Sequence, residues 1–91
     1  MRLEWDEEKR LKTLHERGLD FADLYDVESA SLVIIADTRR DYGEPRFNAF
    51  GRLHGRLITF CYTPRKGAWR IISMRKTNER EQRRYVQAFT S

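Results

Sequence analysis

Six side chains suited to binding or attacking a phosphate lie in the strand-rich middle of the chain. They are Arg46, Arg56, Arg70, Arg75, Glu44 and Tyr62. An arginine guanidinium can bind phosphate through two parallel N–H···O bonds, and it stays charged. Because alternate residues of an extended segment point to the same side, Glu44 and Arg46 are expected to face one groove. The competing interpretation is a solvated sheet face whose surface ion pairs stabilise by under about 1 kcal/mol each.

Arg70 and Arg75 belong to the same predicted strand but have opposite parity. In a regular strand they would point to opposite faces. One of them is therefore expected to face the helices or to lie at a strand end, and the sequence does not decide which.

Charge is unevenly distributed along the 91 residues, although the net charge is only +4. Residues 1–38 hold 5 Lys/Arg and 10 Asp/Glu, whereas residues 39–76 hold 10 Lys/Arg and 2 Asp/Glu. A basic middle beside an acidic front is typical of a surface that faces a polyanion. A charge-rich surface on a small soluble protein is the alternative.

The length and composition predict one domain over residues 1–91, located in the cytoplasm. No apolar run is long enough to cross a membrane, and the N-terminus does not resemble a secretory signal. The single cysteine, Cys61, excludes a disulfide framework and a cysteine-rich zinc site. Gly-rich phosphate loops, G-x-S-x-G and H-E-x-x-H are absent, and His15 and His54 do not suggest a paired metal site. We expect no metal and no cofactor.

The elements that must position these side chains form an α+β layer. A first helix is expected from Asp6, a potential N-cap, to Gly18, which suits a left-handed C-terminus. A second, short helix should open at Asp20 and bury Phe21, Leu24 and Tyr25.

Four strands are expected at residues 31–36, 46–53, 57–63 and 68–75, the last three as an antiparallel meander because their turns are short. A last helix should open at Asn78, with Glu81 completing a capping box and an apolar stripe at Tyr85, Ala88 and Phe89. Helices would then pack mainly on one face of a single sheet.

Several segments, taken together, resemble the BrnT toxin family. They are Trp5-Asp6-Glu7-Glu8-Lys9, Gly18-Leu19-Asp20-Phe21, residues 37–46, Gly51, Gly55-Arg56-Leu57, Tyr62-Thr63, residues 70–76, Glu81 and Tyr85. The G-E-x-R and R-I-I-S-x-R-K motifs, in this order, are its most specific part. One departure is Glu16-Arg17-Gly18, where the family usually carries Lys-His-Gly.

The resemblance implies a RelE-like fold with two N-terminal helices, a four-stranded, mainly antiparallel sheet and a C-terminal helix. It also implies an endoribonuclease toxin that arrests growth by metal-independent attack of the ribose 2′-hydroxyl on the adjacent phosphate. Glu44 would be the base, Arg46 and Arg75 would stabilise charge, and Tyr62 would orient the ribose, stack a base or donate a proton. Further RNA contacts would come from Lys9, Arg39, Arg40, Arg56, Arg70 and Lys76.

The expected partners are an RNA substrate and a cognate antitoxin with a DNA-binding region, in a hetero-oligomeric complex that binds operator DNA, with no membrane involved. Two other functions remain open at this point. A non-catalytic nucleic-acid-binding module would explain the basic middle, and a structural subunit could pair through its sheet edge.

Overall fold

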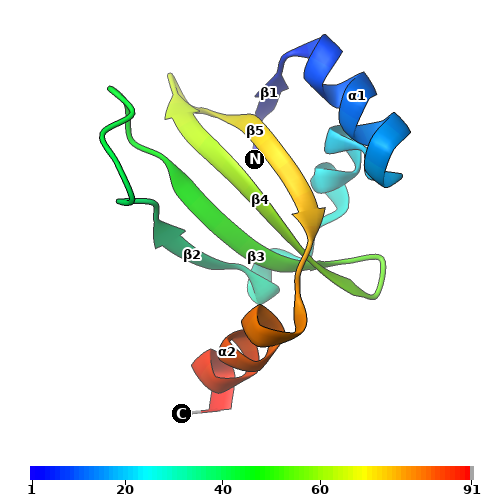
Figure 1. Cartoon of the computed structure of the whole chain (residues 1–91), viewed down its shortest axis with the longest axis vertical. Coiled ribbons are helices and arrows are strands. Elements are labelled where there is room, and N and C mark those ends of the chain that lie inside the picture. Colours follow the sequence, from blue (N-terminus) through cyan, green and yellow to red (C-terminus); the bar gives the residue numbers. More distant parts are fainter. Residues whose placement is uncertain (91) are drawn as a thin grey trace.

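The computed structural model describes residues 1–90, with side chains for residues 1–88. Its elements, in chain order, are strand β1 (Leu3–Trp5), helix α1 (Glu7–Arg17), 3₁₀-helices η1 (Phe21–Asp26) and η2 (Ser29–Ser31), strands β2 (Val33–Ala36), β3 (Phe47–Leu53), β4 (Arg56–Arg65) and β5 (Ala68–Lys76), and helix α2 (Glu79–Thr90). The sheet has the order β1-β5-β4-β3-β2 (Figure 1).

The predicted meander is confirmed, since β3, β4 and β5 pair antiparallel in sequence order. The predicted count of four strands is wrong, because β1 adds a fifth strand parallel to β5. The short second helix is a 3₁₀-helix, η1, in which Phe21 and Leu24 are buried but Tyr25 is 53% exposed. The Tyr25 hydroxyl instead accepts a hydrogen bond from the backbone N–H of Leu3.

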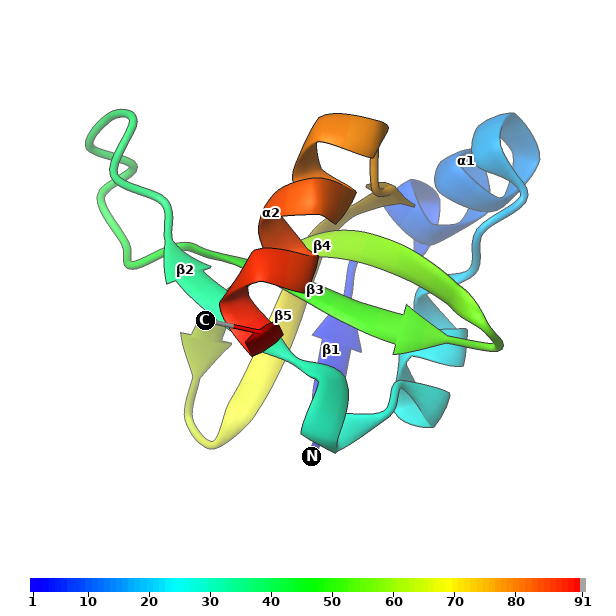
Figure 2. The ribbon, with the colours of Figure 1, turned by 90° about the horizontal axis from the view of Figure 1, so that it is seen from below.

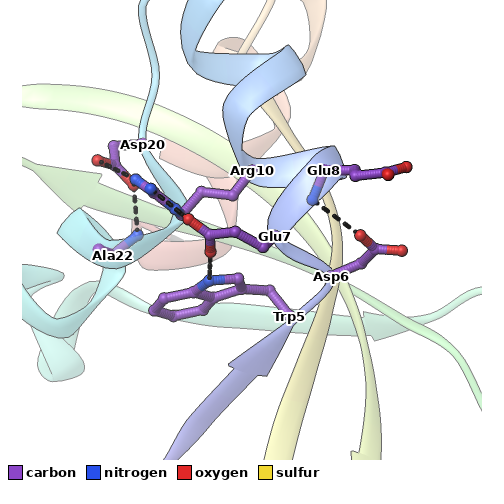
Figure 3. A network of polar contacts seen from close by, with 7 residues as sticks. All are labelled: Trp5, Asp6, Glu7, Glu8, Arg10, Asp20 and Ala22. Carbon is purple, nitrogen blue, oxygen red and sulfur yellow. Dashed lines mark hydrogen bonds and ion pairs between the residues drawn. The ribbon is translucent and has the colours of Figure 1, made fainter.

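A polar network fixes the N-terminal end of α1 (Figure 3). Asp6 caps the helix as predicted, because its carboxylate accepts from the N–H of Glu8 at 2.9 Å. Arg10 links α1 to η1 through Asp20, whose carboxylate lies 3.1 Å from its guanidinium and also caps η1. Gly18 ends α1 with φ at 68°, a left-handed conformation that glycine adopts without strain.

The hydrophobic core lies on one face of the sheet, under the segment that follows α1. Its largest fully buried side chains are Phe21, Phe60, Leu24, Ile58, Ile71 and Met74. We call this side of the sheet the core face. Each such side chain contributes about 1.5–3 kcal/mol by leaving water, so the core face sets the register of the strands.

Helix α2 lies against the other face, so the expectation that helices pack mainly on one face is wrong (Figure 2). Its Tyr85 hydroxyl donates to the carbonyl of Ser31, and a small apolar hollow between α2 and the sheet is lined partly by Val33 and Phe50. The capping box is confirmed: Glu81 N–H donates to Asn78 Oδ1 at 2.9 Å, and Asn78 N–H donates to Glu81 Oε1 at 3.1 Å.

The Phe89 side chain, assigned to the apolar stripe of α2, lies outside the described residues. Within residues 1–90, no helix is long and apolar enough to span a membrane.

Candidate functional site

A register shift in the sheet brings Arg70 and Arg75 to the same face. Cys61 of β4 pairs with Ser73 of β5, but the next β4 residue, Tyr62, pairs with Ile71. Ile72 is thus an extra residue on β5, and such a bulge inverts the alternation of side chains beyond it. Arg75 pairs with Thr59 and Arg70 with Thr63. Because these β4 partners have the same parity, both arginines point away from the core face.

We call the side of the sheet that carries Arg46, Arg70 and Arg75 the arginine face. Arg46 immediately precedes β3 and alternates with Phe47, which packs against the core. The middle of the arginine face is a row formed by Asn48, Cys61 and Ser73, which are paired across three strands. Rows along a sheet are about 7 Å apart, so extended arginines can converge above it.

Burial and nearby charges both affect the pKa of the Cys61 thiol. Burial raises the pKa of its thiol, and the positive charge of Arg46 opposes this rise. The charges of Asp37 and Arg39 also act on it. Charges of the loop at residues 37–46 therefore act on the middle of the arginine face, and the loop lies on the side of the molecule opposite to α1 in both views (Figures 1 and 2).

Arg75 is held by a carboxylate at the beginning of α2. Its two terminal nitrogens donate to the two oxygens of Glu81 at 2.7 and 2.8 Å. This bidentate bond raises the pKa of Arg75 and lowers that of Glu81. The positive charge of Arg39 acts against the rise in the pKa of Arg75.

Glu44 and Arg46 are brought together as predicted. The Nε of Arg46 lies 3.9 Å from Glu44 Oε2, and Arg65 lies 3.9 Å from Glu44 Oε1. Both distances fit ion pairs but are too long for hydrogen bonds. The buried Nε of Arg46 finds no hydrogen-bond partner among the described residues. Its guanidinium carbon instead lies 4.1 Å from the ring centre of Tyr42.

The loop adds two more arginines. Arg39 donates from Nε and Nη2 to the carboxylate of Asp37, at 2.9 and 2.8 Å. Arg40 lies 4.9 Å from the centre of the Tyr42 ring. Together with Arg46 and Tyr42 they line an open hollow of about 390 Å³ beside the sheet. Three of the predicted RNA-contacting or catalytic arginines, Arg39, Arg40 and Arg46, thus line one basic hollow, and Arg75 lies on the same sheet face as Arg46.

The other predicted residues lie elsewhere. Tyr62 is 4% exposed and belongs to the core face, where its ring stacks on Trp69 with centroids 4.1 Å apart. Arg56 pairs with Leu53 and Lys76 pairs with Ile58, both residues of the core face, at the end of the strands away from the loop at residues 37–46. Lys9 projects from α1, which lies on the opposite side from the loop in both views (Figures 1 and 2).

Three residues that make structural contacts near the site were not predicted from the sequence. Asp37 and Tyr42 organise the loop, and the only local signal for this is an Asp followed two residues later by a potential donor. Arg17, within the segment that departs from the usual Lys-His-Gly, donates to the carbonyl of Met74 at 2.7 Å. This bond attaches the end of α1 to β5 immediately before Arg75.

Comparison with known families supplies one match. The family model described as a ribonuclease toxin, BrnT, of type II toxin–antitoxin systems matches residues 5–81 of the chain. No curated protein matches the chain with significant similarity. The matched range begins at Trp5, the last residue of β1, and includes strands β2 to β5, the loop at residues 37–46 and Glu81 at the beginning of α2.

Proposed function

The chain belongs to the BrnT family of ribonuclease toxins of type II toxin–antitoxin systems, and from this premise we propose that the arginine face is where RNA is bound and cut. The observation that carries the proposal is the bulge at Ile72, because it directs Arg70 and Arg75 toward the side that also carries Arg46. Three cations gathered on one sheet face are suited to the charged backbone of RNA.

The proposed reaction is a transesterification that needs no metal ion. The ribose 2′-oxygen attacks the adjacent phosphorus, the bond from phosphorus to the 5′-oxygen breaks, and a 2′,3′-cyclic phosphate and a 5′-hydroxyl form. Arg46 and Arg75 stabilise the additional negative charge on the phosphate oxygens as it develops. The 2′-hydroxyl proton passes to a carboxylate, and the leaving oxygen takes its proton from solvent.

Glu44 is the best candidate for the base. Asp37 and Glu81 are each engaged by two hydrogen bonds from one arginine. Glu44 lies between Arg46 and Arg65 at 3.9 Å from each, with a side chain that is 32% exposed. It is therefore both accessible to a ribose and close to the proposed phosphate site, whereas Tyr62 is left out because its ring is packed in the core.

Family membership implies an antitoxin partner. We extend this to a small antitoxin with a DNA-binding region, which neutralises the toxin and represses the operon as a hetero-oligomeric complex on operator DNA. A RelE-like arrangement of the toxin is part of the same proposal. Co-expression with the neighbouring open reading frame, followed by size-exclusion chromatography and operator-DNA binding, tests it. A neighbour that neither binds the toxin nor restores growth contradicts it.

The ribonuclease proposal is tested with purified protein and a long RNA in the presence of a chelator. We expect fragments that end in a 2′,3′-cyclic phosphate, which phosphatase removes only after acid opening. Fragments that appear only with added divalent metal would contradict the mechanism. An intact RNA that shifts on a native gel would instead support the non-catalytic nucleic-acid-binding module.

A further inference from the structure

Asp37 is a charged residue in an unusually buried position at the end of β2. Its N–H donates to the carbonyl of Arg46 at 2.8 Å, which extends the pairing of β2 with β3 by one residue. By alternation it shares the side of Val33 and Ile35, the side that faces α2. Its side chain is only 2% exposed. A carboxylate is rarely buried to this extent unless it is paired.

The first partner of Asp37 is Arg39. Two side-chain hydrogen bonds, at 2.9 and 2.8 Å, and a longer one from the backbone N–H of Arg39 join the pair. The Arg39 side chain is 78% exposed, so packing does not hold it in place. The buried carboxylate is the fixed end of this bidentate contact, and it determines the direction in which the exposed guanidinium points.

The second partner is Tyr42, which connects Asp37 to Arg46. The Tyr42 hydroxyl donates to Asp37 Oδ2 at 3.2 Å, and its ring supports the guanidinium of Arg46 at 4.1 Å. Arg46 lies directly across the ladder from Asp37, yet the hydrogen bonds of the carboxylate go to Arg39 and Tyr42. The N–H groups of Arg46 are thereby left for an anion other than Asp37.

We propose that Asp37 is a positioning residue, which orients Arg39 by direct pairing and Arg46 through the Tyr42 ring. The inference rests on the proposed ribonuclease function of the arginine face and assigns Asp37 no contact with RNA. The hydrogen bonds from Arg39 also hold the pKa of the carboxyl well below its usual range, which favours the ionised form. The simpler alternative is an Asp that only shapes the loop backbone.

The chain offers a matched control in Asp41. This exposed residue of the same loop also accepts a backbone hydrogen bond, from Gly43 N–H at 2.8 Å, but it holds no guanidinium in the described structure. Asp37→Asn should lower kcat for RNA cleavage by on the order of 10²-fold, because small displacements of charged groups are that costly. The KM should change by less than about threefold, and Asp41→Asn should leave both constants near wild type.

Tyr42→Phe and Tyr42→Leu separate the second route from the first. Removing only the hydroxyl should give a smaller loss in kcat than removing the ring, because the phenyl ring still supports Arg46. These variants also keep the proposal falsifiable if Asp37→Asn fails to fold. Equal kcat for Tyr42→Leu and wild type would refute the route to Arg46.

A readout independent of cleavage is the side-chain Nε–H signal of each arginine in ¹⁵N-edited NMR spectra. In the wild type, the Arg39 signal should be shifted and rigid on the nanosecond timescale. In Asp37→Asn it should become mobile. In Tyr42→Leu the signals of Arg46 and Arg40, which both lie over the ring, should change, while the Arg39 signal should stay rigid. An Arg39 signal that keeps its wild-type position and rigidity in folded Asp37→Asn overturns the proposal. If wild-type protein cuts no RNA but the signals behave as expected, the ribonuclease function of this face fails and the positioning role stands.

Discussion

Replacement of Arg75 by alanine separates a role in catalysis from a role in holding α2. The pair with Glu81 has ideal bidentate geometry, but the Arg75 side chain is 44% exposed and that of Glu81 is 23% exposed. For a pair this accessible to water, loss of the contact costs about 1 kcal/mol of stability or less. Loss of a group that stabilises charge in the transition state costs about 10²–10³-fold in rate, or roughly 2.7–4 kcal/mol. The effect on cleavage should therefore exceed the effect on folding.

Two further variants sharpen this comparison. Arg75→Lys keeps the charge but loses the planar fork, so its rate should lie between those of wild type and Arg75→Ala. Arg83→Ala removes the same charge from α2 at an exposed position that lines a different hollow, with Glu79 and Val86. It should cleave RNA at nearly the wild-type rate, which excludes a simple effect of net charge.

The assay is single-turnover cleavage of a labelled RNA at saturating protein, with urea unfolding of each variant in parallel. Arg75→Ala should unfold within about 1 kcal/mol of wild type and cleave at least about 100-fold more slowly. Cleavage within threefold of wild type by a folded Arg75→Ala would refute the assignment of Arg75 to the reaction. A collapse of stability with unchanged cleavage per folded molecule would show that Arg75 serves only to anchor α2.

Three other outcomes can be measured. Glu44→Gln should lower single-turnover cleavage at neutral pH by about 10²-fold or more through loss of the base, with unchanged thermal unfolding, and a wild-type rate would exclude this role. Gly51→Ala should destabilise by about 1–3 kcal/mol in urea unfolding, because the new methyl group would lie 2.8 Å from Leu32 Cδ2; an unchanged midpoint would mean that Leu32 moves freely. Arg75 lowers the pKa of Glu81, so the pair stabilises fully above the usual glutamate pKa of about 4.3, and this contribution is lost as pH falls through the lower value in the folded protein. The free energy of unfolding should thus fall less between pH 7 and pH 3 in Glu81→Gln than in wild type. An identical loss in the two proteins would refute the linkage.

Local patterns were sufficient for most of the fold. The caps at Asp6, Gly18 and Asn78 depend on hydrogen bonds within a few residues, so sequence identifies them directly. The meander follows from strands joined by tight turns. Strand β1 has only three residues and pairs with β5 at the other end of the chain, so no local periodicity reveals it. The face that α2 covers is likewise set by contacts with distant residues such as Ser31.

The site was less predictable, because it depends on which side of the sheet each side chain occupies. Parity predicts that Arg70 and Arg75 diverge, and this holds only for a strand without interruption. The sequence around Ile72 contains no glycine or proline to mark a bulge, yet the register shift there inverts the parity of everything before it. The same shift turns Trp69 and Ile71 toward the core, where Trp69 stacks on Tyr62. Core packing and convergence of the arginines are therefore two results of one inserted residue. If β5 instead alternated regularly through Ile72, Arg70 would share the core face with Met74, and Trp69 and Ile71 would share the arginine face with Arg75.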